Sequence, residues 1–247
     1  MKNAFIIDHI RNIIYTEVPK CGSTTVHQLF LDVFGFKNDR GPHHAIWSRD
    51  MQAEREQAGI ESIRIKDAAL DTFIANHPNY RFFTITRNPY SRCISAYTNQ
   101  LRRFAKKRHP AQYLSAKIQV KLSPLKSSVK FPSKSSQYDL LNNILSQRIS
   151  FDELLESLER HGPSFDKHFD LQVNIVKPDI IPYFRILDLE NLSEGLGSIF
   201  GETIDFGKSR KLNTSNPAIT PQTMPRHNRK AIHRIYARDF EVFGYSA

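Results

Sequence analysis

The stretch Glu17-Val18-Pro19-Lys20-Cys21-Gly22-Ser23-Thr24-Thr25 lies where an apolar, β-branched run gives way to a helical pattern. Residues 13–18 have the composition of a buried strand. Residues 26–34 repeat apolar side chains every three or four positions, which predicts a helix with one apolar face. We therefore expect this stretch to connect a strand to a helix.

The residue types of this predicted loop suit an anion. Gly22 lets the backbone approach a ligand closely. Ser23, Thr24 and Thr25 place hydroxyl groups at the start of the helix, where unpaired N–H groups and the helix dipole attract phosphate. Lys20 adds a positive charge. The loop lacks the first glycine and the Gly-Lys-Ser/Thr order of the nucleotide-binding P-loop, so an ordinary strand-to-helix turn stays open as an alternative.

A second turn of the same kind follows residues 81–86, which have the pattern of another strand. Arg87 stands at the end of this strand, and a helical segment begins two residues later. Ser91, Arg92 and Ser95 are three or four positions apart, so they can share one helical face and converge on a second phosphate. Two anion sites beside one sheet indicate a ligand with two phosphate ends.

Both motifs resemble those of the sulfotransferases that use 3′-phosphoadenosine-5′-phosphosulfate (PAPS), closest to the family-2 carbohydrate type. Residues 18–25 are similar to the family's 5′-phosphosulfate loop. Residues 87–97 are similar to its 3′-phosphate motif, Arg-x-Pro-x-x-Arg-x-x-Ser-x-Tyr. Weaker similarities at residues 166–172, 186–192 and 236–245 extend the resemblance over nearly the whole chain.

The resemblance implies an α/β fold, a three-layer sandwich with a mostly parallel central sheet of the P-loop-NTPase-like sulfotransferase type. It implies a single sulfotransferase domain over residues 1–247. The implied reaction is in-line transfer of a sulfuryl group from PAPS to a hydroxyl of a carbohydrate or glycolipid acceptor. A histidine base and no metal ion are expected.

The resemblance also gives roles to individual residues. Lys20 is expected to stabilise the leaving phosphate, and His44 is the candidate base for the acceptor hydroxyl. His43 and His168 are candidate acceptor contacts, and for each histidine a surface or structural role stays open. The residues expected to bind the donor are Lys20, Cys21, Gly22, Ser23, Thr24, Thr25, Arg87, Ser95, Arg210 and Lys211.

The composition points to anionic partners. The chain of 247 residues has 35 Lys and Arg against 25 Asp and Glu, a net charge of +10 at pH 7. The donor, an acidic glycan or an anionic membrane surface would each account for this surplus without nucleic acid. Residues 110–137 are rich in Lys, Ser and Pro, which predicts a mobile basic insertion that contributes to acceptor binding.

Cysteine usage and hydropathy bear on location. Cys21 and Cys93 both lie inside the proposed donor motifs, so we expect no disulfide and a reducing compartment. No apolar run approaches the roughly 20 residues of a membrane span, and no signal-peptide pattern opens the sequence. We expect a cytoplasmic protein, with peripheral contact to an anionic membrane left open. The alternatives in function are a P-loop-like kinase that uses ATP and a basic, non-enzymatic nucleic-acid-binding protein.

Overall fold

The computed structural model describes residues 2–33, 35, 40–105, 150–200 and 219–246. The predicted insertion and both Arg210 and Lys211 lie outside these ranges. The chain forms two compact units: the first comprises Met1–Asn88, Leu171–Asn216 and Glu241–Ser246, and the second comprises Pro89–Asp170 and Pro217–Phe240. The single domain over residues 1–247 stays a prediction.

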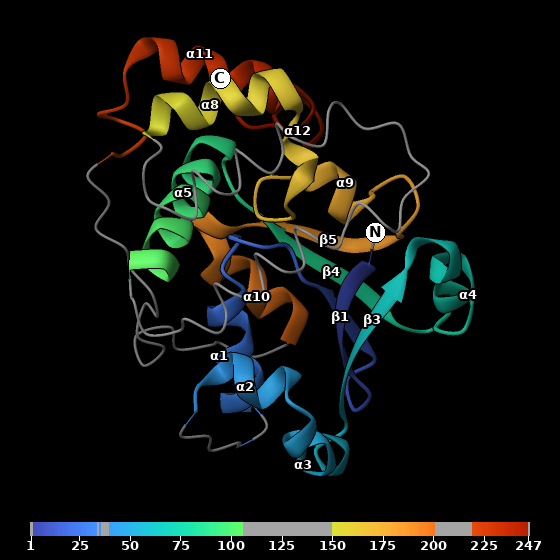
Figure 1. Ribbon diagram of the computed structural model, residues 1–247. Helices are drawn as coiled ribbons and strands as arrows, with labels where there is room; N and C mark the ends of the chain where they lie inside the picture. Colours follow the sequence, from blue (N-terminus) through green and yellow to red (C-terminus); the bar gives the residue numbers. More distant parts are fainter. Residues whose placement is uncertain (1, 34, 36–39, 106–149, 201–218, 247) are drawn as a thin grey trace, which may run out of the picture. The chain divides into compact units, whose positions relative to one another are not determined.

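A five-stranded mixed sheet forms the centre of the first unit, with strand order β3-β1-β2-β4-β5 (Figure 1). Its strands are β1 (Lys2–Asp8), β2 (Ile13–Thr16), β3 (Ile60–Lys66), β4 (Arg81–Thr86) and β5 (Tyr183–Asp188). β2, β4 and β5 are parallel, and β2 and β4 correspond to the strands predicted at residues 13–18 and 81–86. β1 pairs antiparallel with both β2 and β3, so these two strands extend the sheet at one edge.

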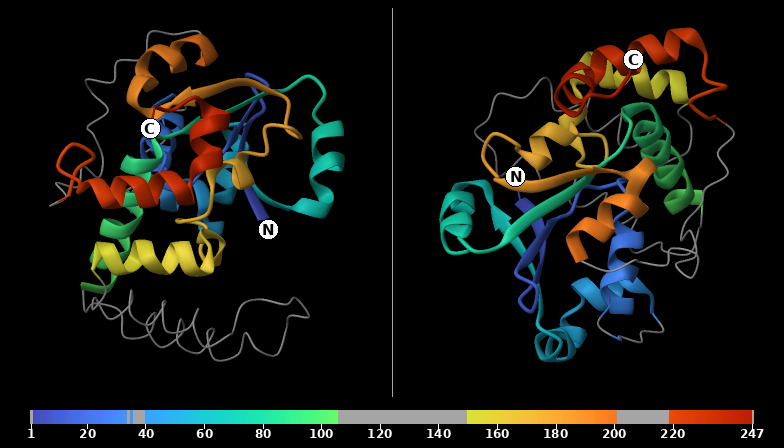
Figure 2. Two further views of the ribbon diagram at one scale, coloured as in Figure 1. Left: turned by 90° about the horizontal axis from the view of Figure 1, so that it is seen from above. Right: turned by 180° about the vertical axis from the view of Figure 1, so that it is seen from behind.

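The helices of the first unit cover both faces of this sheet, as Figures 1 and 2 show. They are α1 (Ser23–Val33), α2 (Pro42–Trp47), α3 (Gln52–Gln57), α4 (Leu70–Ala75), α9 (Gln172–Val176) and α10 (Leu192–Phe200). α1 and α10 pack on one face, and α4 packs on the other. The three-layer α/β fold class is therefore confirmed.

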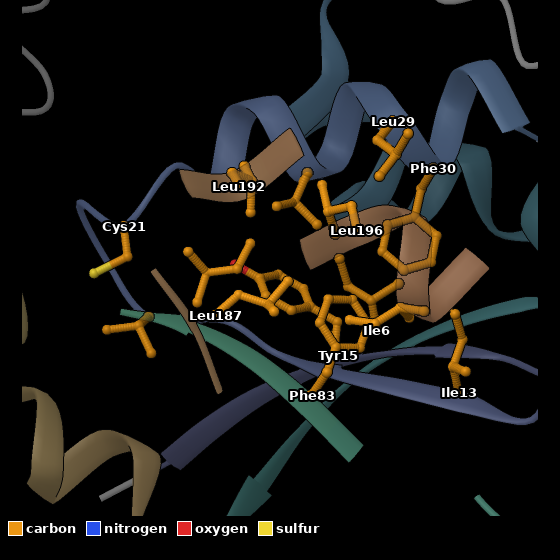
Figure 3. Packing of buried hydrophobic residues seen from close by; sticks show 14 of the residues in the cluster. Ile6, Ile13, Tyr15, Cys21, Leu29, Phe30, Phe83, Leu187, Leu192 and Leu196 are labelled. Atoms are coloured by element: carbon orange, nitrogen blue, oxygen red, sulfur yellow. The ribbon is translucent and has the colours of Figure 1, made fainter. Parts of the chain in front are cut away.

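The strands build a core on each face because alternate side chains point to opposite sides of a sheet. Tyr15 and Phe83 point to α1 and α10, where they meet Phe30 and Leu196 (Figure 3). The neighbouring Ile14 points to the other face and joins the cluster beneath α4. Full burial of one such side chain stabilises the fold by about 1.5–3 kcal/mol.

The second unit is helical in its described residues. Its helices are α5 (Pro89–Ala105), α8 (Phe151–His161) and α11 (Arg226–Ile235), and α12 (Ala237–Phe243) begins in it. α11 packs on both α5 and α8. Ser150 and Glu153 have the spacing of a capping box, and they cap α8 reciprocally. None of the described helices combines the length and the apolar character needed to span a membrane.

The position of the candidate site follows from the parallel pairing of β2 with β4. The carboxyl ends of parallel neighbours lie at the same edge of a sheet, and ligands of open α/β sheets bind outside that edge. The loop at residues 17–22 follows β2, and Arg87 follows β4 directly. The two predicted anion-binding loops are therefore neighbours at one edge of the sheet.

Candidate functional site

The loop after β2 turns sharply before α1 begins. Lys20 has a φ of 71° and Gly22 a φ of 80°, so both occupy the left-handed region. The N–H groups of Thr25 and Val26 donate to the Gly22 oxygen at 2.8 and 3.1 Å. Since the N–H of Thr25 is used in this way, the backbone N–H groups that could bind an anion here are those of residues 22–24.

Gly22 also lies against Leu189, which follows β5. A Cβ atom at Gly22 would lie 2.5 Å from Cδ1 of Leu189, well inside van der Waals contact. The positive φ and this close approach both require a residue without a side chain. The fold therefore requires glycine at this position, whether or not a ligand also does.

The buried side chain of Gln172, at the start of α9, joins the loop after β2 to the loop after β4. Its Oε1 accepts from the Arg87 N–H at 2.9 Å and from the Cys21 thiol at 3.1 Å. Its Nε2 donates to the Arg87 oxygen at 2.9 Å. One side chain thus holds the main chain of Arg87 and the thiol of Cys21 in fixed positions, with no exposed surface of its own.

The guanidinium of Arg87 lies beside the same loop. Its Nη1 donates to the Lys20 oxygen at 3.3 Å, and its Nε is 3.9 Å from Oε1 of Glu190. The structure therefore brings Arg87 next to the backbone of Lys20. Each of the two predicted anion sites contributes one of these cationic residues.

Glu190, for which the sequence predicts no role, places a carboxyl group beside Arg87. Burial raises its pKa to about 7, a hydrogen bond and charge repulsion from Asp188 add to the rise, and the positive charge of Arg87 opposes it. Asp188 itself accepts a hydrogen bond from the Tyr245 hydroxyl at 3.1 Å. Near neutral pH the carboxyl of Glu190 is therefore partly protonated, which reduces the negative charge beside the loop.

Both candidate histidines of the first unit lie on α2, which packs against α1. His44 is about one-quarter exposed, and its Nε2 is 3.5 Å from both Oδ2 of Asp50 and Nη1 of Arg40. The carboxylate of Asp50 is placed to orient this ring. His43 is exposed, and its ring centroid is 5.5 Å from that of His27.

In the second unit, Ser95 and Ser91 are partly exposed and one turn apart on α5. Arg92, which the sequence places on the same face, is instead buried. Its Nη1 donates to the Asp170 oxygen at 2.7 Å. The side chain of Arg92 therefore ties α5 to the chain around Asp170, and Ser95 stays the candidate ligand on this helix.

His168 also belongs to the second unit. Its Nδ1 lies 2.6 Å from Oδ1 of Asp166, whose pKa is lowered by hydrogen bonds and charge attraction from His168 against the opposing effect of burial. Residues 166–170 form a turn. His168 therefore lies in a turn that precedes α9.

Comparison with protein families identifies the family of the chain. The family model described as the sulfotransferase family matches residues 3–246. The chain belongs to the sulfotransferase family. No curated protein and no solved structure matches the chain. Membership of the sulfotransferase family confirms the resemblance stated from the motifs, and it supports sulfuryl transfer to an acceptor as the general reaction.

Gly22→Ala should destabilise the protein more than Gly162→Ala does. The two glycines have φ values of 80° and 78°, where another residue costs about 1–3 kcal/mol. A Cβ at Gly162 meets no described atom within 4 Å, whereas one at Gly22 must displace Leu189. Urea denaturation should show an additional loss of about 1 kcal/mol or more for Gly22→Ala. Equal losses would mean that Leu189 moves without cost.

Glu190→Gln should change how stability depends on pH. Glu190 has a pKa of about 7 in the folded protein and, like other glutamates, about 4.3 when unfolded. The raised pKa of Glu190 contributes stability to the fold below about pH 4, and this contribution to the free energy of unfolding is lost as the pH rises to about 7. The free energy of unfolding of Glu190→Gln should therefore rise relative to wild type over that interval.

Denaturation curves at several pH values measure this difference, and Glu156→Gln is the matched control because Glu156 is exposed. The difference between Glu156→Gln and wild type should not depend on pH. If the difference in the free energy of unfolding between Glu190→Gln and wild type also did not change with pH, the raised pKa of Glu190 would be contradicted.

Proposed function

We propose that the protein transfers a sulfuryl group from PAPS to a hydroxyl of a carbohydrate or glycolipid acceptor. The observation that carries this proposal is the connection of two candidate anion-binding loops through Gln172 at the carboxyl edge of β2 and β4. PAPS has a phosphosulfate at its 5′ end and a separate 3′-phosphate, so it needs two such loops. Family membership supports the same general reaction.

The proposed chemistry depends on position and charge rather than on a covalent intermediate. The acceptor oxygen forms a bond to sulfur while the bond from sulfur to the bridging oxygen of the 5′-phosphate breaks. The acceptor proton passes to His44, and 3′-phosphoadenosine-5′-phosphate leaves. Lys20 would neutralise the charge that grows on the leaving phosphate, together with the N–H groups of residues 22–24.

The proposed donor contacts differ in kind. Cys21 is fully buried, so only its main chain could contact the phosphosulfate. The other proposed contacts of the phosphosulfate are the backbone of Gly22 and the hydroxyls of Ser23, Thr24 and Thr25. Arg87 and Ser95 would bind the 3′-phosphate. Phosphate would then replace Glu190 as a partner of the Arg87 guanidinium. Arg210 and Lys211, outside the described residues, are proposed to cover the donor.

The acceptor is proposed to be anionic. A hollow of about 370 Å³ in the second unit is lined by Tyr90, Arg226, Arg229, Lys230, His233 and Arg234. Guanidinium groups bind carboxylate and sulfate oxygens. This hollow supports an acidic glycan or an anionic lipid headgroup as acceptor. His43, His168 and residues 110–137 are further proposed acceptor contacts, and a cytoplasmic location stays a prediction.

Loss of Lys20 and loss of His44 should have different consequences for transfer of radiolabelled sulfate from PAPS to a panel of acidic glycans and glycolipids. Lys20→Ala should lower turnover by about 10²-fold or more, because one transition-state partner is removed, and should weaken donor binding. His44→Ala should lower turnover by about 10²-fold or more, as for a lost general base, with donor affinity unchanged. Wild-type activity should rise with pH as the histidine base loses its proton, and this rise should be absent in His44→Ala.

Lys66→Ala and His77→Ala are the matched controls, because both residues lie outside the proposed site, and both should retain wild-type turnover. No labelled product from PAPS with any acceptor would contradict the proposed function. Full activity in His44→Ala with an unchanged pH profile would assign the base to another residue, with His43 and His168 as the next candidates.

A further inference from the structure

We propose that Glu17, His27 and His43 form a binding site for one divalent transition-metal ion such as Zn²⁺. The three side chains each offer one ligand atom, and these atoms all lie within 4.8 Å of one another. Glu17 directly follows β2, His27 lies on α1 and His43 on α2, all in the first unit. The resemblance to sulfotransferases implied no metal ion, and these three residues are not adjacent in the sequence.

The state of His27 is the observation that points to a ligand. Its side chain is 1% exposed, and neither of its ring nitrogens has a hydrogen-bond partner among the residues that the structure describes. Burial of an imidazole removes its hydrogen bonds to water, so a buried imidazole without partners destabilises a fold. A metal ion would supply the missing partner of one nitrogen.

The distance between His27 and Glu17 fits coordination to one ion. Nε2 of His27 is 3.4 Å from Oε2 of Glu17, without the geometry of a hydrogen bond. Zinc binds histidine nitrogen and carboxylate oxygen at about 2.0–2.2 Å, which places two ligands of a tetrahedral ion roughly 3.3 Å apart. The two atoms therefore already have the separation of neighbouring ligands.

The third ligand and the surroundings of the carboxylate also fit. Nε1 of Trp47 donates to Oε2 of Glu17 at 3.0 Å, and such hydrogen bonds orient the ligands of metal sites. The ring of His43 is inclined by 32° to that of His27, and it is exposed. A rotation of this exposed side chain would complete the site, and its exposure gives an ion a path of entry.

The ligand types indicate the class of ion. Two imidazoles and one carboxylate suit Zn²⁺ and its first-row neighbours, whereas Mg²⁺ and Ca²⁺ prefer oxygen ligands throughout. Three protein ligands leave a fourth position for water or another oxygen. The ion would also fix α2, which carries His44, against the strand end that leads to Lys20. The metal site does not depend on the proposed sulfuryl transfer.

Titration of chelator-treated protein with Co²⁺ tests the site, because tetrahedral Co²⁺ absorbs visible light and Zn²⁺ displaces it. We expect one Co²⁺ per chain and a rise in melting temperature on addition of Zn²⁺. His43→Ala should lower the affinity by about tenfold or more without affecting the fold, since His43 is exposed. His27→Asn should lower the affinity by a similar factor.

His9→Ala is the matched control. His9 also pairs with a glutamate, with Nε2 at 3.3 Å from Oε2 of Glu61, but both side chains are exposed. This variant should bind Co²⁺ as wild type does. Absence of the tetrahedral spectrum, or affinity unchanged in both His43→Ala and His27→Asn, would overturn the proposal. Because the measurement is binding, it distinguishes this failure from a failure of the proposed sulfuryl transfer.

Discussion

The candidate donor site depends on one buried amide, the side chain of Gln172. It satisfies the N–H and the oxygen of Arg87 and accepts from the thiol of Cys21. Each such hydrogen bond contributes about 0.5–1.5 kcal/mol net, but a buried backbone group left without its partner costs about 1–3 kcal/mol. The relative position of the two loops is therefore held by a contact that the fold cannot easily lose.

The charged side chains around this amide interact with one another and with the loop after β2. Arg87 donates to the Lys20 oxygen and lies near Glu190, so its guanidinium has protein partners. Because burial raises the pKa of Glu190 to about 7, its carboxyl is partly protonated near neutral pH and its negative charge is reduced. The reduced charge of Glu190 lowers the electrostatic cost of the proposed phosphate position beside Arg87.

The local features of the fold could be predicted from the sequence. The β-branched run at residues 13–18, the strand at residues 81–86 and the capping box of Ser150 and Glu153 each depend on neighbours in the chain, and each is present. β3 was not predicted, because it is an edge strand with few buried residues and its position is set by pairing with β1.

The contacts that build the site could not be predicted from local sequence. Helical spacing puts Arg92 and Ser95 on related faces, but only packing decides that Arg92 is buried. The bonds of Gln172 and the raised pKa of Glu190 arise between segments far apart in the chain. The grouping of Glu17 with two histidines has the same origin.

The most direct test of the two-loop donor site is calorimetry of 3′-phosphoadenosine-5′-phosphate and of ADP, with the wild type and with Gln172→Met. The first ligand has a 3′-phosphate and ADP has none. Wild type should bind 3′-phosphoadenosine-5′-phosphate at least about tenfold more tightly than ADP, in line with one charge-assisted phosphate contact. Gln172→Met should lose most of this preference. Equal affinities of the wild type for the two ligands would contradict a second phosphate site at Arg87.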